Sequence, residues 1–271
     1  MHKLTGKRII LGVTGGISAY KAAFLVRLLR KNGANVRVVM TQSATKFVTP
    51  LTFQALSAKP VHTELVDLNT ETAMGHIELA KWADLILIAP ASANFIARYA
   101  NGFAEDLLST LCLATDSPVI IAPAMNQQMW RNQATQENLE RINARGITVV
   151  GPTAGVQACG DDGPGRMLEP EEIVGHTANM FQTNILTGSR LLVTAGPTRE
   201  AIDPVRFLSN RSSGRMGYAV ATAAAEAGAD VTLISGPVDL AAIGIEKIVH
   251  VTSAEEMQES VMQRINNIDI F

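Results

Sequence analysis

Residues 8–40 read RIILGVTGGISAYKAAFLVRLLRKNGANVRVVM, two apolar runs separated by a helical pattern. The runs RIILGV (8–13) and VRVVM (36–40) have the length and β-branched content of buried strands. Between them, large apolar side chains recur every four residues from Tyr20, and Gly33 follows as a helix stop signal. A strand, a glycine turn, a helix and a second strand in this order predict the opening of a doubly wound α/β domain.

Three further apolar runs of strand length follow: DLILIAP (84–90), PVIIAP (118–123) and ITVV (147–150). Runs that are apolar throughout are typical of parallel strands covered by helices on both faces. The expected fold class is therefore α/β, with a doubly wound parallel sheet.

A second α/β unit begins near residue 190. RLLVTAGPTRE (190–200) again ends a strand in a glycine turn, and EAGADVTLISG repeats the glycine and alanine that precede the strand in KNGANVRVVMT. We expect a first domain over residues 1–189, with the polar segment 183–189 as its linker. The start of a second, Rossmann-like α/β domain is expected over 190–271.

The end of this second unit carries two signals. Ser253 and Glu256 have the spacing of a capping box, which predicts the start of a helix. The final NNIDIF enters what we predict to be a third strand. We therefore expect the second sheet to be incomplete in this chain.

Composition excludes several classes of function. The chain has 271 residues, of which 47% are hydrophobic and 18% charged, as in ordinary globular proteins. Its net charge is −2 with scattered Lys and Arg, so no footprint for nucleic acid or an anionic membrane is present. Cys112 and Cys159 form no CxxC pair, and Cys112 lies in an apolar helical pattern that predicts a core position. With no signal-peptide pattern or membrane span, a cytoplasmic location is expected.

The first glycine turn, GVTGGISAYK, joins a strand to a helix, where backbone N–H groups and the helix dipole favour a phosphate. It lacks the GxGxxG spacing of dinucleotide-binding turns, and no carboxylate follows the second strand to hold a ribose. Hydroxyls at Ser18, Thr41 and Ser43 suit a phosphomonoester instead. Alternatively, Gly15 and Gly16 only make a tight turn.

Two more polar clusters follow predicted strands, with Ser92 and Asn94 in APASANFIA and Asn126 in PAMNQQMW. Because ligands of open α/β sheets bind beyond the carboxyl ends of the strands, the three turns are expected to line one crevice. The structural alternative is that these side chains cap the helices that follow.

These motifs resemble a known family. TGGISAYK, GHIELAKWAD, PASANFIA, PAMNQQMW and ACGDDGPGRM, in this order, resemble the FMN-dependent cysteine decarboxylases. TAGPTREAIDPVRFLSNRSSGRMG resembles the opening of phosphopantothenate–cysteine ligases. Together they resemble the bacterial bifunctional enzymes of coenzyme A biosynthesis that join a phosphopantothenoylcysteine decarboxylase to such a ligase.

The resemblance implies a flavoprotein domain that converts 4'-phosphopantothenoylcysteine to 4'-phosphopantetheine. Direct loss of CO₂ from an N-acyl cysteine would leave an unstabilised carbanion, so the reaction needs an electron sink. In the family FMN supplies it by oxidising the thiol carbon, and a hydride and a proton return after CO₂ has left. For the ligase half, the resemblance implies CTP and Mg²⁺.

The same resemblance assigns residues. His76 matches a base or orienting group, Asn126 the group that binds the substrate carboxylate, and Cys159 the proton donor to the enethiolate, on a flap that closes over substrate. Expected FMN contacts are Gly15, Gly16, Ile17, Ser18, Thr41, Ser43, Pro90, Ser92, Asn94 and Ala124. Expected substrate contacts are Met125, Met129, Gly165, Arg166 and Met167. In the ligase half, Asn210 matches a group that steadies an acyl-cytidylate, and Arg206, Arg211 and Arg215 suit phosphopantothenate.

Other readings stay open. Another FMN-dependent cysteine decarboxylase or a flavin prenyltransferase of the same fold is one, and a non-catalytic flavoprotein regulatory subunit is another, although that class would lack the histidine or the flap cysteine. A metal site from His76, Cys159, Asp161 and Asp162 lacks recognisable ligand spacing. Family members form trimers or dodecamers, so a homo-oligomer is expected.

Overall fold

The computed structural model describes residues 4–65, 75–240, 242 and 245–271. They pack into two compact units, Leu4–Thr177 and Ala178–Phe271. The division falls inside α8 (Pro170–Asn179), ahead of the predicted boundary at 189/190. The segment expected to be a linker is held by the second unit, since Leu186 N donates to Ala227 O at 2.8 Å.

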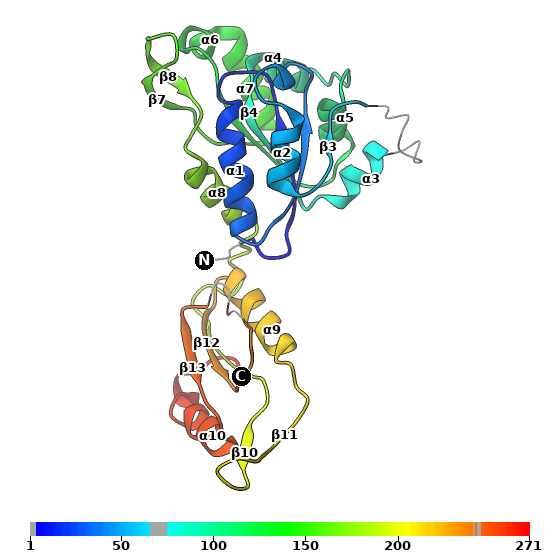
Figure 1. The fold of residues 1–271 in the computed structure, drawn as a ribbon. Coiled ribbons are helices and arrows are strands. Elements are labelled where there is room, and N and C mark those ends of the chain that lie inside the picture. Colours follow the sequence, from blue (N-terminus) through cyan, green and yellow to red (C-terminus); the bar gives the residue numbers. More distant parts are fainter. Residues whose placement is uncertain (1–3, 66–74, 241, 243–244) are drawn as a thin grey trace. The chain divides into compact units, whose positions relative to one another are not determined.

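The first unit, coloured from blue to green in Figure 1, is built on a parallel sheet. This sheet has six strands in the described ranges, in the order β3-β2-β1-β4-β5-β6. Its strands are β1 (Arg8–Val13), β2 (Asn35–Met40), β3 (Val61–His62), β4 (Leu85–Ala91), β5 (Val119–Pro123) and β6 (Thr148–Val149). Every residue of β4 is buried, as the uninterrupted apolar run predicts. The predicted doubly wound parallel sheet is confirmed; the short edge strand β3 is not apparent in the sequence pattern.

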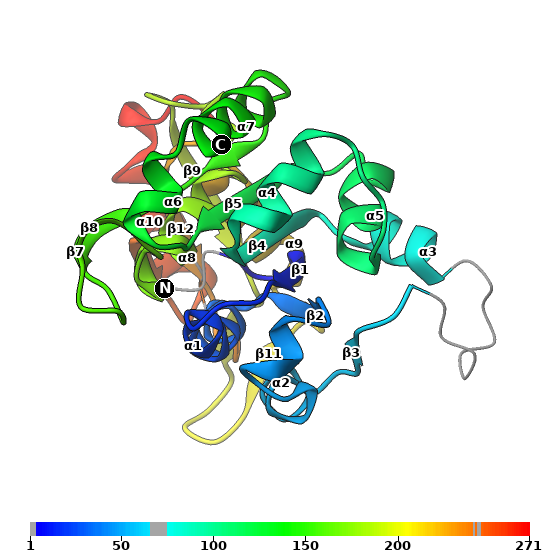
Figure 2. The same ribbon diagram turned by 90° about the horizontal axis from the view of Figure 1, so that it is seen from above.

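Helices cover both faces of this sheet (Figure 2). One face carries α1 (Ala19–Lys31), α2 (Pro50–Ser57) and α8. The other carries α3 (Gly75–Trp82), α4 (Ala93–Ala100), α5 (Leu107–Ala114) and α7 (Gln133–Ala144), whose apolar side chains share one core cluster with the sheet. Cys112 of α5 belongs to that cluster, as expected, and burial raises the pKa of its thiol. The short η1 (Ala44–Lys46) and α6 (Gln127–Arg131) follow β2 and β5.

An antiparallel hairpin of β7 (Thr153–Val156) and β8 (Asp162–Arg166) carries the motif predicted to be a flap. Its turn contains Cys159. The sequence pattern does not predict strands here, because glycine and proline are poor strand formers. In the structure the DGPGR stretch forms β8, which pairs with β7 in a separate two-stranded sheet.

The second unit contains a parallel sheet of order β13-β12-β9, formed by β9 (Arg190–Ala195), β12 (Asp230–Ser235) and β13 (Lys247–His250). It also contains α9 (Arg215–Glu226), α10 (Ala254–Met262), η2 (Ile265–Asn267) and a hairpin of β10 (Arg199–Ala201) and β11 (Phe207–Ser209). The predicted capping box of Ser253 and Glu256 is present at the start of α10. The prediction of a third strand at the chain end is wrong, because β13 is the third and Ile270 bridges Leu191 on the other side of β9.

Within the described ranges, no helix has the length and apolar character needed to cross a bilayer.

Candidate active site

A pocket of about 1020 Å³ lies at the carboxyl ends of β1, β2, β4 and β5. The strand order reverses between β1 and β4, which is where open α/β sheets bind ligands. The buried Thr14 ties these two strands together, because its Oγ1 donates to Pro90 O at 2.8 Å and accepts from Ser92 N at 2.9 Å. These two hydrogen bonds hold the ends of β1 and β4 together at the base of the pocket.

The turn between β1 and α1 forms one side of the pocket. A Cβ on Gly15 would lie 2.5 Å from the Cβ of Ser43, so only glycine lets the turn approach the loop after β2. Within the described chain, the backbone N–H groups of residues 15–18 donate to no acceptor. They precede α1, and the hydroxyls of Thr41 and Ser92 line the same pocket. Free donors at a helix N-terminus suit the phosphate of a mononucleotide such as FMN.

On another side, Asn126 brings α6 and the β7–β8 hairpin together. Its Oδ1 accepts from Gln128 N at 2.8 Å and caps α6, while its Nδ2 donates to Asp161 Oδ2 at 2.9 Å. The cap thus fixes which end of the amide faces the pocket. The Cys159 thiol donates to Asp161 Oδ2, and its sulfur also lies 3.4 Å from Asn126 Nδ2. The hydrogen bonds from Asn126 and then Cys159 hold the pKa of Asp161 below its usual value.

The hairpin is attached to the rest of the unit at its base. Met125 N donates to Gly165 O at 2.9 Å, and a Cβ on Gly165 (φ +138°) would lie 2.2 Å from Met125 O. Lys21 of α1 donates to Glu169 Oε1 at 2.7 Å and to Met167 O at 3.3 Å. Since its side chain is only 11% exposed, this cation anchors the segment that follows β8.

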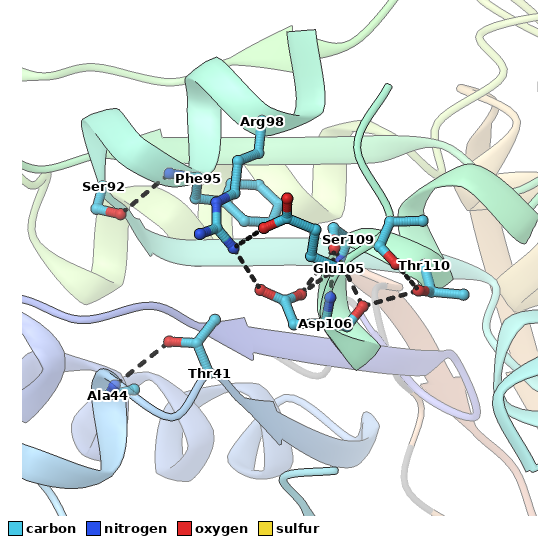
Figure 3. Close-up of polar contacts among 10 residues, drawn as sticks. Thr41, Ala44, Ser92, Phe95, Arg98, Glu105, Asp106, Ser109 and Thr110 are labelled. Atoms are coloured by element: carbon cyan, nitrogen blue, oxygen red, sulfur yellow. Dashed lines mark hydrogen bonds and ion pairs between the residues drawn. The ribbon is translucent and has the colours of Figure 1, made fainter. Parts of the chain in front are cut away.

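Arg98 of α4 also lines the pocket. Figure 3 shows it directed toward Glu105 and Asp106, with nitrogen–oxygen distances of 3.1 and 3.8 Å. Asp106 caps α5 by accepting from Ser109 N at 2.8 Å, so the carboxylate that faces Arg98 is itself held in place. Arg98 is thus a positioned cation beside the Ser92 end of the pocket (Figure 3).

The pocket collects most of the residues assigned from the sequence to the first unit. These are Gly15, Gly16, Ile17, Ser18, Thr41, Ser43, Ser92, Asn94, Ala124, Met125, Asn126, Met129, Cys159, Gly165, Arg166 and Met167. Pro90, an expected FMN contact, does not line the pocket; its carbonyl oxygen accepts the hydrogen bond from Thr14 Oγ1. Further residues that line the pocket include Thr14, Lys21, Arg98 and Gln157, and Asp161 contacts Asn126 and Cys159. The sequence patterns do not predict these positions in the site, although Lys21 and Asp161 stand inside the quoted motifs TGGISAYK and ACGDDGPGRM.

His76 is not brought into this pocket. It lies in the first turn of α3, half-buried, and does not line the cavity. In both views, α3 and the β7–β8 hairpin lie at opposite sides of the unit (Figures 1 and 2). His76 and Cys159 of the same chain therefore do not meet in this pocket.

The residues assigned to a ligase lie in the second unit. Asn210 Oδ1 accepts from Ser212 N at 2.8 Å, which is a turn contact. The Nε of Arg206 lies 2.6 Å from Asp203 Oδ2, which offsets part of its positive charge. Arg215 begins α9, and Arg211 is exposed in the preceding loop.

Two family models match the chain. Residues 1–182 match the flavoprotein model, and residues 186–271 match the C-terminal domain of the DNA/pantothenate metabolism flavoproteins. The coenzyme A biosynthesis bifunctional protein CoaBC of Vibrio cholerae is 59% identical over 100% of this chain and 68% of its own length. The chain belongs to the CoaBC family. The Bacillus subtilis member is 46% identical over 98% of this chain and 67% of its own length.

Solved structures resemble the first unit. A cysteine-to-serine mutant of PPC decarboxylase, complexed with pantothenoylaminoethenethiol, is 32% identical with a TM-score of 0.60, covering 65% of this chain and 98% of its own. The FMN binding protein AtHal3 is 34% identical with a TM-score of 0.57, covering 63% of this chain and 94% of its own. The predicted α/β flavoprotein fold is confirmed.

Proposed function

We propose that the chain catalyses the FMN-dependent decarboxylation of 4'-phosphopantothenoylcysteine to 4'-phosphopantetheine in coenzyme A biosynthesis. The main structural support is that Asn126 and Cys159 lie in contact in the pocket at the carboxyl ends of the sheet strands. CoaBC membership and the likeness to PPC decarboxylase support the same activity. The flavoprotein match and the likeness to the FMN binding protein AtHal3 confirm the predicted FMN cofactor.

The first-unit pocket suits FMN. The free N–H groups of residues 15–18 and the hydroxyls of Thr41, Ser43 and Ser92 would hold its phosphate and polar edges. When bound, FMN accepts an electron pair from the cysteine portion of the substrate and later returns it. The protein's task is to bind, to orient and to deliver a proton.

We assign those tasks to the hairpin side of the pocket. The Asn126 amide, directed by its cap, donates to the substrate carboxylate and holds it until CO₂ leaves. The Cys159 thiol then gives its proton to the enethiolate carbon. The relative crystallised with pantothenoylaminoethenethiol has serine in place of a cysteine. That compound is what an enzyme lacking this acid would accumulate.

We further propose that the enzyme is a homo-oligomer working in the cytoplasm, with trimers or dodecamers as the expected states. Three large side chains are exposed near this pocket or further along α1: Ile17 (60%) and Tyr20 (52%) line the pocket, and Phe24 (54%) follows one turn later in α1. Covering them with another copy would remove apolar surface from water. Because His76 does not reach the pocket of its own chain, a second copy could place its His76 there.

For the second unit we propose a part in phosphopantothenate–cysteine ligation with CTP and Mg²⁺. The match to the DNA/pantothenate metabolism domain supports this role, as does the exposed Arg211 beside Asn210. We expect ligase activity only when the complete ligase domain is present. In such a protein, Asn210→Ala should lower the yield of CTP-dependent ligation, measured by product assay.

The decarboxylase proposal is tested by incubating the purified, FMN-saturated chain with 4'-phosphopantothenoylcysteine. We expect CO₂ and 4'-phosphopantetheine in equal amounts. A chain that binds FMN and the substrate but releases no CO₂ would contradict the proposal.

A further inference from the structure

The Asn126 amide has a hydrogen-bond partner on the β7–β8 hairpin turn. Its Oδ1 is committed to capping α6, so Nδ2 is the donor left for the pocket. In this structure Nδ2 donates at 2.9 Å to the carboxylate of Asp161, a residue of the hairpin turn. The proposed substrate presents the same chemical group, a carboxylate, to the same donor.

We propose that Asp161 is an internal stand-in for the substrate carboxylate: it occupies the Asn126 amide in the substrate-free enzyme and is displaced when substrate binds. This inference rests on the proposed function. Only a ligand that brings its own carboxylate competes with Asp161 for the Asn126 amide, so Asp161 sets how tightly carboxylate ligands bind and leaves other ligands unaffected.

The exchange also acts on the flap. Asp161 accepts from the Cys159 thiol as well as from Asn126, so one carboxylate directs the proton of Cys159 and links the hairpin turn to α6. A second link, from Gln127 N to Gln157 Oε1 at 3.1 Å, does not involve Asp161 and keeps the hairpin attached. Displacing Asp161 therefore redirects the thiol without releasing the flap.

The internal contact lowers the apparent affinity for substrate. A ligand that binds only the fraction of molecules in which Asn126 is free has its affinity reduced by that fraction. A hydrogen bond to a charged acceptor is stronger than one to a neutral acceptor, by about a factor of ten in an equilibrium constant. Replacing the charged competitor by a neutral one is thus expected to change binding of a carboxylate ligand by about tenfold.

Calorimetric titration of the FMN-loaded chain with two unreactive analogues tests this. The first is 4'-phosphopantothenoylserine, which keeps the carboxylate, and the second is 4'-phosphopantothenoylethanolamine, which lacks it. Asp161→Asn keeps the size and one acceptor oxygen but removes the charge. We expect it to bind the serine analogue about tenfold more tightly than the wild type and the ethanolamine analogue equally. Asp161→Ala, which removes the contact altogether, should show the same selective gain.

Asp162→Asn is the matched control, because this neighbouring carboxylate is also exposed but makes no contact with Asn126. It should bind both analogues as the wild type does. Unchanged or weaker binding of the serine analogue by both Asp161 variants, or an equal gain for the two analogues, would overturn the inference. Failure of the wild type to bind either analogue would instead contradict the proposed function and remove the basis of this inference with it.

Discussion

At the scale of single residues, Asn126 shows that one side chain can cap a helix and still present a hydrogen-bond donor to a pocket. The motif PAMNQQMW permits either a helix cap or a ligand-binding amide. In the structure Oδ1 accepts the capping bond while Nδ2 donates to Asp161, so the cap orients the donor that we propose for the substrate carboxylate. Asp161 is not identified as a partner from the sequence, because spacing does not reveal which carboxylate a hairpin turn directs toward a helix cap.

This double role leads to a prediction for Asn126→Asp. Aspartate caps helices as well as asparagine does, so the melting temperature should stay close to that of the wild type. The variant loses the amide donor and places a second carboxylate beside Asp161 and the substrate. We expect kcat/KM to fall by about tenfold to a hundredfold, because this factor corresponds to the free energy of one hydrogen bond to a charged group. Wild-type turnover by a well-folded variant would show that Asn126 does not bind the carboxylate.

At the scale of elements, continuous apolar runs predict the central strands well. RIILGV is β1 residue for residue, and the runs at 84–90 and 118–123 differ from β4 and β5 by only a residue at their ends. Edge elements are harder, because pairing rather than side-chain burial stabilises them. The hairpin β7–β8 contains Gly and Pro, and β10–β11 is exposed throughout, so neither has a hydrophobic pattern to detect.

The turn from β1 to α1 gives a prediction about the cofactor. Gly15→Ala places a methyl group 2.5 Å from the Cβ of Ser43, so the turn must move away from the loop after β2. We expect the dissociation constant for FMN, measured by flavin fluorescence quenching, to rise by at least about tenfold, the equivalent of one lost charge-assisted hydrogen bond.

Gly175→Ala is the control for this substitution. Gly175 lies within α8, and no atom lies within 4 Å of the place that an added methyl group would take. The change should leave FMN binding intact and stabilise the protein by about 0.4–1 kcal/mol, because alanine favours the helix. Normal FMN affinity in Gly15→Ala would contradict the assigned cradle.

At the scale of the whole molecule, the first strand of the sheet in each unit begins with an arginine that pairs with an aspartate far along the chain. Arg8 at the start of β1 binds Asp84, with Nη2 to Oδ1 at 2.6 Å, and Asp84 N donates back to Arg8 O. Arg190 at the start of β9 binds Asp269, with Nη2 to Oδ1 at 3.2 Å, and Asp269 N donates to Arg190 O. The internal echo seen in the glycine turns thus extends to the opposite end of each sheet, which the sequence does not reveal because the partners are far apart along the chain.

The first of these pairs makes stability depend on acid pH. Its hydrogen bond to Arg8 holds the pKa of Asp84 below its usual value. The unfolded chain therefore binds a proton more readily, so the stabilisation is present above pH about 4 and is lost as the pH falls through the lowered pKa. Asp84→Asn should lower the free energy of unfolding at pH 7 by up to about 1 kcal/mol, as for a partly exposed pair.

Urea unfolding followed by tryptophan fluorescence measures this effect in the first unit, which contains both Trp82 and Trp130. The difference between variant and wild type should shrink over the acid range that begins at about pH 4 and ends below the lowered pKa of Asp84. A difference that persists undiminished at the acid end of that range would contradict the assigned cause.

The reaction that we propose for the molecule is tested most directly through its product in the absence of the flap thiol. Serine keeps the shape of the turn but is a much weaker acid, so Cys159→Ser should release CO₂ and then stop before carbon is protonated. Mass spectrometry of products from 4'-phosphopantothenoylcysteine should show 4'-phosphopantetheine for the wild type and for Cys112→Ala, whose cysteine is buried in the core. For Cys159→Ser it should show CO₂ and a species two hydrogens lighter, the aminoenethiol. Normal 4'-phosphopantetheine from Cys159→Ser would contradict the assignment of this thiol as the acid, and no CO₂ from any of the three proteins would contradict the decarboxylase itself.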